Sequence, residues 1–189
     1  MLAILKRKLA FFRRRRRDFA KHQGGGAALE FAIVAAPFIA LLVAGLQTTL
    51  AFFAGQVLES AVADSSRSIL TGSAQNGNLN QSAFAQLVCQ KVQALFSCPS
   101  LMVDVQTAAS FSAASTAMPT LTFNGQGQVN NNWAYNPGNP GDIVVVRVMY
   151  LWPTFLGPLG FSLSNQTNGS LLLMATAVFK NEPYVPTGT

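Results

Sequence analysis

Residues Phe31–Leu46 read FAIVAAPFIALLVAGL, and none of these side chains is polar. Gln47, Thr48 and Thr49 then interrupt the run before LAFFA, but no Asp, Glu, Lys, Arg or His occurs from residue 31 to residue 58. An α-helix rises about 1.5 Å per residue and needs roughly 20 residues to cross a hydrocarbon core ~30 Å thick. The stretch therefore predicts one transmembrane helix, from which the rest of the chain can be interpreted.

The positive charge of the chain lies almost entirely before this helix. Residues 1–25 hold nine Lys or Arg and one Asp, which gives +8, whereas residues 26–189 hold four Lys or Arg and six Asp or Glu, which gives −2. The densest part is a run of five arginines: Arg13, Arg14, Arg15, Arg16 and Arg17. Such runs also occur in nucleic-acid-binding and nuclear-targeting segments. Directly before a span, however, the run favours an orientation signal that contacts anionic lipid headgroups and leaves the N-terminus in the cytoplasm.

The composition argues against several classes of protein. Of the 189 residues, 50% are hydrophobic and only 11% are charged, whereas about a quarter are charged in an average soluble domain. The chain therefore lacks the surface composition of an ordinary cytosolic protein. The skewed charge also excludes nucleic-acid binding spread over a folded domain. A cleaved secretory signal is disfavoured, because its apolar region is typically about 7–15 residues long and ends at an A-x-A-like site. Here the uncharged run is far longer and no such site ends it.

Two features at the start of the span do not fit a simple membrane anchor. Gly24, Gly25 and Gly26 separate the basic segment from the span, and each glycine costs a helix about 1 kcal/mol relative to alanine. We therefore expect an extended, accessible backbone there, which is the form a protease needs. Glu30 is costly to submerge, so it is a functional candidate that requires a partner. The alternative is a snorkelling carboxylate that the dipole favours at a helix N-terminus.

A basic leader, a glycine, a Glu-Phe pair and an unbroken apolar helix together resemble the type IV-pilin-like prepilins. More narrowly, GGAALEFAIVAAPFIALLVAGLQ resembles the TadE-like minor pseudopilins of the tight-adherence (Flp-type) pilus system. The later segments AVADSSRSILTG, GDIVVVRVMYLWP and ATAVFKNEPY are similar to the same family, whereas residues 73–135 match it only loosely. The resemblance implies a pilin-like fold and a subunit of an adhesive pilus.

The resemblance also implies how the chain is processed. In this family a prepilin peptidase cuts on the cytoplasmic side after a glycine and leaves Glu at the fifth position, which places the cut between Gly25 and Gly26. Gly24 and Gly26 are alternatives for the residue before the cut. Removing 25 residues from 189 leaves a mature chain of 164. The Glu30-Phe31 pair would then set the register between subunits, with the Glu30 carboxylate facing the new α-ammonium of Gly26 in a neighbour.

Beyond the span, periodic apolar residues predict that the helix continues to Thr71 and ends at Gly72. Asn80 can cap a second helix, whose apolar stripe consists of Phe84, Leu87, Val88, Val92 and Leu95. Three runs rich in Val, Leu or Ile follow as strand candidates: 101–108, 143–151 and 171–179. Residues 124–141 read as a loop that Trp133 and Tyr135 pin to the domain.

Helices followed by strands predict an α+β fold, with a long N-terminal transmembrane helix, a small pilin-like domain and an antiparallel sheet of about three strands. The expected division is a leader over residues 1–25, a transmembrane helix over 26–58 and an exported domain over 59–189.

The two cysteines, Cys89 and Cys98, follow the span and so lie in an oxidising space if the N-terminus is cytoplasmic. Compartment logic favours a disulfide between them, with two buried thiols or a metal pair as the alternatives. A metal site needs more ligands, and the single histidine, His22, lies in the leader. We therefore expect no metal and no other cofactor.

Catalysis finds little support, because no nucleophile motif, phosphate-binding loop or paired-carboxylate motif occurs. Asp104 and Asp142 are expected to cap turns. The expected function is a minor pseudopilin in the bacterial inner membrane, with prepilin peptidase, other pilins, the pilus assembly platform and anionic lipids as partners, and no nucleic acid. The alternative is an uncleaved bitopic envelope protein with an outer binding domain, and an envelope enzyme is disfavoured. Retention or loss of the leader distinguishes the first two.

Overall fold

The computed structural model describes residues 25–154 and 160–185, so the predicted leader, with Arg13–Arg17 and His22, lies outside the described residues. The chain forms two compact units, divided between Gly45 and Leu46. The helix α2 (Gly25–Leu70) contributes to both, as one uninterrupted helix of 46 residues. Judged by length and composition, α2 is long enough and apolar enough to cross a membrane, and it is the one such helix among the described residues.

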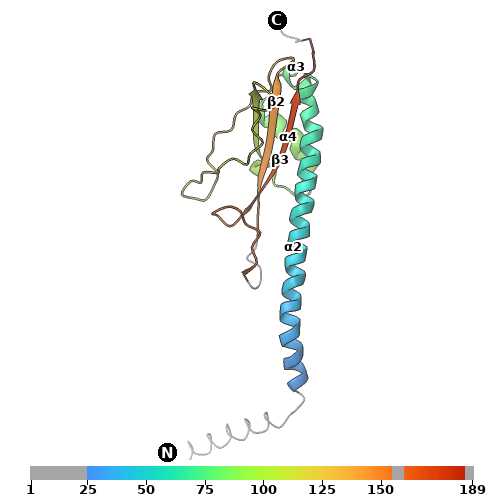
Figure 1. Cartoon of the computed structure of the whole chain (residues 1–189), viewed down its shortest axis with the longest axis vertical. Helices are drawn as coiled ribbons and strands as arrows, with labels where there is room; N and C mark the ends of the chain where they lie inside the picture. The colour runs from blue at the N-terminus through green and yellow to red at the C-terminus, as the bar shows by residue number, and fades with distance from the viewer. Residues whose placement is uncertain (1–24, 155–159, 186–189) are drawn as a thin grey trace, which may run out of the picture. The chain divides into compact units, whose positions relative to one another are not determined.

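The second unit, residues 46–189, contains the remaining elements (Figure 1). The helical ones are α3 (Ser73–Asn76), α4 (Gln81–Val92) and the short 3-10 helix η1 (Cys98–Ser100). The strands are β1 (Met102–Ala108), β2 (Ile143–Trp152) and β3 (Leu171–Lys180), which form an antiparallel sheet in the order β1-β2-β3. These elements confirm the predicted α+β fold, and each strand lies within one residue of its predicted bounds.

The end of α2 is fixed by a glycine and by the C-terminal segment. Gly72 follows the helix with a φ of 78°, a left-handed conformation that side chains other than hydrogen disfavour. A Cβ atom on Gly72 would also collide with the ring of Tyr184. Just beyond β3, the Glu182 amide donates a hydrogen bond to the Leu70 carbonyl at 2.9 Å. The last turn of α2 is therefore joined to the residues that follow the last strand.

The second predicted helix, α4, begins where its cap was expected. The Asn80 side chain accepts a hydrogen bond from the Ala83 amide at 2.9 Å, which satisfies one of the free amides of the first turn. Phe84, Val88 and Val92, spaced four residues apart, are buried on one face. This face is part of the core, as the apolar stripe predicted.

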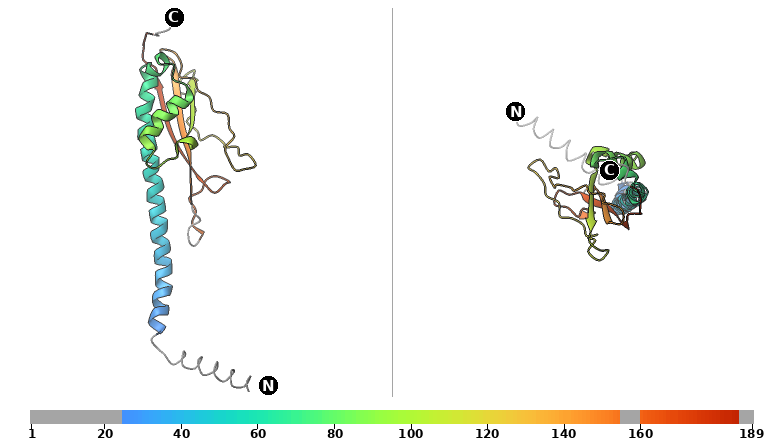
Figure 2. Two further views of the ribbon diagram at one scale, coloured as in Figure 1. Left: turned by 180° about the vertical axis from the view of Figure 1, so that it is seen from behind. Right: turned by 90° about the horizontal axis from the view of Figure 1, so that it is seen from above.

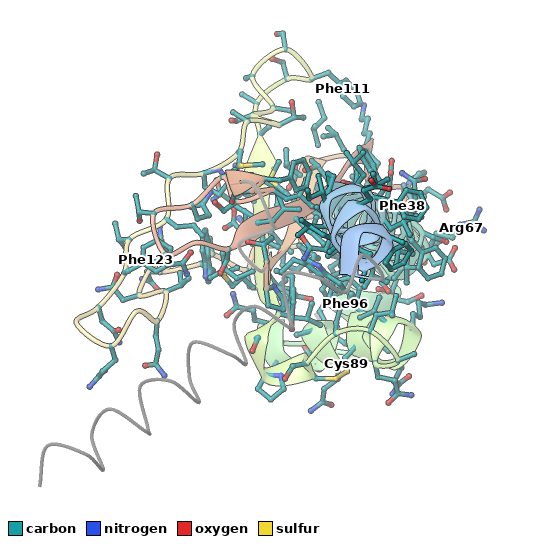
Figure 3. All side chains as sticks on the ribbon, turned by 90° about the horizontal axis from the view of Figure 1, so that it is seen from below. Phe38, Arg67, Cys89, Phe96, Phe111 and Phe123 are labelled. Carbon is teal, nitrogen blue, oxygen red and sulfur yellow. A yellow bond between two sulfur atoms is a disulfide. The ribbon has the colours of Figure 1, made fainter. Side chains whose placement is uncertain are left out.

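The sheet is covered on both faces (Figure 2). Alternate residues of β2, among them Val144, Val146 and Val148, pack against α2 and α4, with Leu58 and Phe84 at the centre. On the opposite face Met149 is buried beneath the long connection between β1 and β2, which contributes Leu121 and Phe123. Figure 3 labels Phe96 on the helical side and Phe123 in the connection. Because both of its faces are covered, β2 reads as an apolar run, IVVVRVMYLW, in which Arg147 is the one charged residue.

Candidate functional site

The N-terminal end of α2 holds the residues that were predicted to be cleaved. Gly25 and Gly26 form the start of the helix, both are exposed, and a Cβ atom on either would meet no atom within 4 Å. The expectation of an extended backbone at these two glycines is therefore wrong. The first four amides of any helix lack an intrahelical partner, so two glycines there cost little against the propagation of a long helix.

Glu30 lies one helical turn after Gly26. The spacing of four residues places both on the same side of α2, with an axial rise of about 6 Å between them. The Glu30 side chain is exposed, as is Phe31, which is 75% exposed. Among the residues that the structure describes, no Lys or Arg forms an ion pair with Glu30. The Glu30 carboxylate therefore lies one turn from Gly26, the predicted N-terminal residue of a cleaved chain. No Lys or Arg in the described part of its own chain pairs with it.

The N-terminal half of α2 exposes large apolar side chains around most of its circumference. Exposed fractions lie between about a half and three quarters at these positions: Leu29, Phe31, Ile33, Val34, Phe38, Ile39, Leu41, Leu42, Leu46 and Leu50. A helix that is apolar all round is either a core helix or a membrane span, and these side chains have no core to enter. The arrangement can anchor the chain in lipid and pack against other apolar helices.

One feature of this half was missed in the sequence analysis. Small residues recur every fourth position along it: Ala28, Ala32, Ala36, Ala40 and Ala44. In a helix this spacing makes a narrow seam along which another helix can approach closely. Counting small residues at an interval of four, rather than apolar residues alone, would have identified it.

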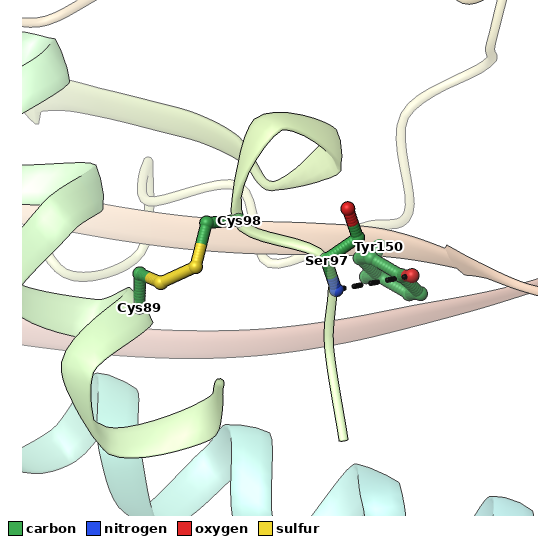
Figure 4. Close-up of a disulfide and its surroundings, with 4 residues drawn as sticks. All are labelled: Cys89, Ser97, Cys98 and Tyr150. Atoms are coloured by element: carbon green, nitrogen blue, oxygen red, sulfur yellow. Dashed lines mark hydrogen bonds between the residues drawn. A yellow bond between two sulfur atoms is a disulfide. The ribbon is translucent and has the colours of Figure 1, made fainter. Parts of the chain in front are cut away.

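The exported cysteines are joined by a disulfide between Cys89 and Cys98, whose Cα atoms are 5.5 Å apart (Figure 4). It connects the last full turn of α4 to η1, directly before β1. Beside it the Ser97 amide donates a hydrogen bond to the Tyr150 hydroxyl at 3.4 Å, and the rings of Phe96 and Tyr150 meet edge to face with centroids 4.9 Å apart. The segment between helix and sheet is therefore fixed at several points.

Asp104 and Asp142 have different roles. Asp142 caps a turn as predicted, because its Oδ2 accepts a hydrogen bond from the Asn139 amide at 2.8 Å. The turn-capping prediction for Asp104 is wrong: this residue is 1% exposed, lies opposite Arg147 on the neighbouring strand and forms an ion pair with it. Its carboxylate also accepts from Gln106 Nε2 and from the Ala134 amide, each at 3.0 Å. A strand carboxylate with a cross-strand arginine is satisfied by that partner and needs no turn.

The long connection returns along the outer edge of β1. The Val105 amide donates to the Ala134 carbonyl at 2.9 Å, and the Asn136 amide donates to the Val105 carbonyl at 2.8 Å. Tyr135 packs against Phe84 with centroids 6.1 Å apart, and burial raises the pKa of its hydroxyl. Trp133 packs against the core on the opposite face of the sheet. Both aromatic residues thus hold the connection in place, as predicted.

Two open cavities adjoin this region, of about 480 and 390 Å³. Met102 and Pro99 border both, and no charged residue lines either one. Within residues 25–154 and 160–185, no cluster of three or more His, Cys, Asp or Glu side chains could hold a metal ion. The cavities therefore offer no acid–base pair for catalysis, and α2 is the better candidate for the functional element.

Comparison with known proteins agrees with the resemblance expected for this helix. A family model described as TadE-like protein matches residues 25–67, which is 43 of the 189 residues and covers α2 almost to its end. No curated protein and no solved structure matches the chain. The match confirms the predicted TadE-like resemblance and suggests a component of a tight-adherence pilus.

Proposed function

We propose that this chain is a minor pseudopilin, a structural or assembly subunit of an adhesive tight-adherence pilus. The observation that carries the proposal is the exposed apolar half of α2, within the region that matches TadE-like proteins. This half anchors the chain in the bacterial inner membrane and packs against other pilins. The basic segment orients the chain by contact with anionic headgroups, so that the N-terminus is cytoplasmic and the second unit faces the periplasm or the exterior.

The burial pattern supports a revised boundary for the span. Ala51 and Ala54 are the first residues of a regular buried face of α2 within the second unit. We place the membrane-spanning part at residues 26–50, which rise about 37 Å and so suffice to cross the hydrocarbon core, with the exposed Phe52 and Phe53 at its outer boundary. The exported part then begins at residue 51, rather than at residue 59.

Prepilin peptidase removes the leader between Gly25 and Gly26. Cleavage creates an α-ammonium on Gly26, and the Glu30 carboxylate of a neighbouring subunit pairs with it. In low dielectric an unpaired carboxylate is strongly penalised and a paired one is tolerated, so the pair fixes the register of adjacent helices. The exposed position of Glu30 and its lack of a cation among the described residues support this role.

The intact mass of the protein from membranes with and without the peptidase tests the proposal. We expect a mature chain that begins at Gly26 only where the peptidase is present. A chain that keeps the arginine run in both samples would contradict the proposal and would leave an uncleaved, signal-anchored envelope protein that binds its partner through the outer domain.

Glu30→Gln tests the pairing separately from processing. The variant should insert and be cleaved like the original chain but should assemble with other pilins at least about tenfold less, because the neutral amide loses the ionic partner. Glu59→Gln, at an exposed position of the same helix, is the matched control. Co-isolation of differently tagged pilus subunits measures assembly, and equal assembly of the two variants would remove the role assigned to Glu30.

A further inference from the structure

The start of β3 lies at the end of the second unit from which α2 enters it. Within this unit α2 and the red strand β3 run alongside each other and point the same way (Figures 1 and 2). Just after β3, the Glu182 amide is bonded to the Leu70 carbonyl at the end of α2. Back from there to Leu171 the chain spans about 36 Å at ~3.3 Å per residue, which is the rise of roughly 24 helical residues. The start of β3 is therefore about level with residues 46–50 of α2.

The connection between β2 and β3 begins and ends at this level, because Trp152 at the end of β2 pairs with Leu171. Figure 1 shows its described parts extending past the strands on this side. The Thr154 hydroxyl donates a hydrogen bond to the Gly169 carbonyl, which ties the two sides of the connection together. Between these two residues, Phe161 is 38% exposed. The connection therefore presents an aromatic side chain at this end of the unit.

Two further segments bring exposed apolar side chains to the same end. Phe52 and Phe53 follow directly after residue 50 of α2, and both are exposed. Met118, in the connection between β1 and β2, is exposed as well, and its sulfur lies 4.0 Å from Asn165 Nδ2 in the β2–β3 connection. Single exposed apolar residues are normal, but their gathering in one region marks a contact surface. We call Phe52, Phe53, Met118 and Phe161 the apolar end.

The exposed charges of the second unit lie away from the apolar end. No Asp, Glu, Lys, Arg or His occurs in residues 46–58, 92–103 or 148–179. On α2 the first charge after the span is at residue 59, which is about 13 Å beyond residue 50. The exposed charged residues of the described second unit lie on α2 from there onward, pair with that part of α2, or follow the end of β3. They are Glu59, Asp64, Arg67, Lys91, Lys180 and Glu182.

We propose that the apolar end lies against the outer surface of the membrane that α2 crosses, with Phe161 and Met118 inserted among the lipid headgroups and upper acyl chains. The inference rests on the proposed function, in which the span ends at residue 50, level with this end. Aromatic side chains favour the membrane interface, and burial of apolar area there provides the attraction. A protein partner would have to fit between the unit and the membrane, whereas lipid is already present there. The contact gives the chain a second attachment to the membrane.

Quenching of tryptophan fluorescence by brominated phosphatidylcholine tests the proposal on the full-length chain in bilayer nanodiscs. Trp133 and Trp152 are first replaced by Phe, and each variant then carries one new tryptophan. Phe38→Trp lies at the centre of the proposed span, and Phe161→Trp lies at the apolar end. Phe111→Trp is the matched control, because Phe111 is exposed but follows the end of β1 that pairs with the start of β2, at the opposite end of the sheet. Figure 3 labels Phe38 and Phe111.

Phe161→Trp should be quenched at least about twofold more by bromine near the headgroups than by bromine near the chain ends, because an interfacial side chain enters only about 5–10 Å. Phe38→Trp should show the reverse order, and Phe111→Trp should be quenched by neither lipid. Unquenched Phe161→Trp, or quenching equal to that of Phe111→Trp, would overturn the inference while quenched Phe38→Trp leaves the proposed span intact. Unquenched Phe38→Trp would overturn the span, and this inference with it.

A charge at the apolar end separates lipid contact from mere nearness to the membrane. With Trp133→Phe, Trp152 is the single tryptophan, and bromine near the headgroups should quench it. Phe161→Asp should lower this quenching at least about twofold, because a carboxylate is costly to bury in the interface, whereas Phe111→Asp should leave it unchanged. Both positions are exposed, so the unfolding temperature should stay within a few degrees of the original. Absence of quenching of Trp152, or equal quenching in the two Asp variants, would overturn the proposal.

Discussion

Between Gly25 and Leu50, α2 exposes large apolar side chains on every side, whereas from Ala51 to Leu70 it buries one narrow face. The buried face consists largely of small residues: Ala51, Ala54, Leu58, Ala61, Val62, Ser65, Ser66 and Ile69. The opposite face carries Glu59, Asp64 and Arg67. One continuous helix therefore has the composition of a membrane span in its first half and of an amphipathic core helix in its second.

Under the proposed boundary at residue 50, hydrophobicity alone does not locate the end of the span. The uncharged run extends to Leu58, yet burial against the sheet begins at Ala51. Within residues 51–58 both patterns meet: Ala51, Ala54 and Leu58 are buried, whereas Phe52 and Phe53 are 72% and 55% exposed like the large apolar side chains before them. Substitutions in matched pairs, one in each half, can separate these two patterns.

The largest effect is expected from removing a core side chain. Leu58 is 0% exposed and Leu42 is 50% exposed. Leu58→Ala should lower the free energy of unfolding of the second unit by about 2–5 kcal/mol, because it leaves a cavity. Leu42→Ala should change it by less than about 0.5 kcal/mol. Thermal unfolding of the full-length protein in detergent, followed by near-UV circular dichroism, measures both, and equal effects would contradict the division of α2.

A charged substitution is expected to have its larger effect in the first half of α2, which is the reverse of the order expected for the alanine substitutions. Val34→Lys places an ammonium group in the proposed span and should cost about 2.5–3.5 kcal/mol of insertion free energy. Ala63→Lys, on the exposed polar side of α2, should leave insertion unchanged. The fraction of each variant that resists alkaline extraction from membranes gives the comparison. Equal extraction of the two variants would show that the first half is not the part in lipid.

The disulfide affects only the second unit. Replacing Cys89 and Cys98 together by Ser should lower the free energy of unfolding by about 3 kcal/mol, because a loop of roughly ten residues is no longer closed in the unfolded chain. Membrane insertion should not change. Comparison of unfolding temperatures with and without a reductant in the original chain provides an independent check, since reduction should reproduce the effect of the double substitution.

The smallest effect concerns the cap of α4. Asn80→Ala should cost about 1 kcal/mol, because the Ala83 amide loses its acceptor. Asn80→Asp, which keeps an acceptor, is the control and should stay close to the original stability. If alanine and aspartate proved equivalent in thermal unfolding, the side-chain cap would not contribute to the stability of the helix.

Local signals in the sequence were sufficient for most of the fold. Gly72 and Asn80 mark helix ends through their own backbone and side-chain chemistry, and the three strands stand out as β-branched or apolar runs between turn residues. The role of Asp104 could not be read locally, because its partner Arg147 is 43 residues away and is brought opposite only by the register of β1 and β2. The covering of the β1 edge by residues 134–136 depends in the same way on long-range pairing.

Only part of the candidate site was predictable from the sequence. Glu30 and Gly26 were identified from charge and spacing, and their positions one turn apart follow from helix geometry. That the helix begins at Gly25 did not follow from glycine propensities, since a terminal position hardly penalises glycine. The edge position of β3 was also not visible in sequence, because an edge strand and a central strand with the same residues differ only in their neighbours.

The hydrogen bond between Leu70 and Glu182 has a mechanical consequence. It joins the C-terminal end of α2 to the segment that leaves β3, and the ring of Tyr184 over Gly72 strengthens the same junction. A force applied along α2 therefore reaches the sheet at its far end as well as through the buried face of the helix. Because the buried face of α2 belongs to the same core cluster as residues of β2 and β3, such a load is shared between that core and the junction at Leu70.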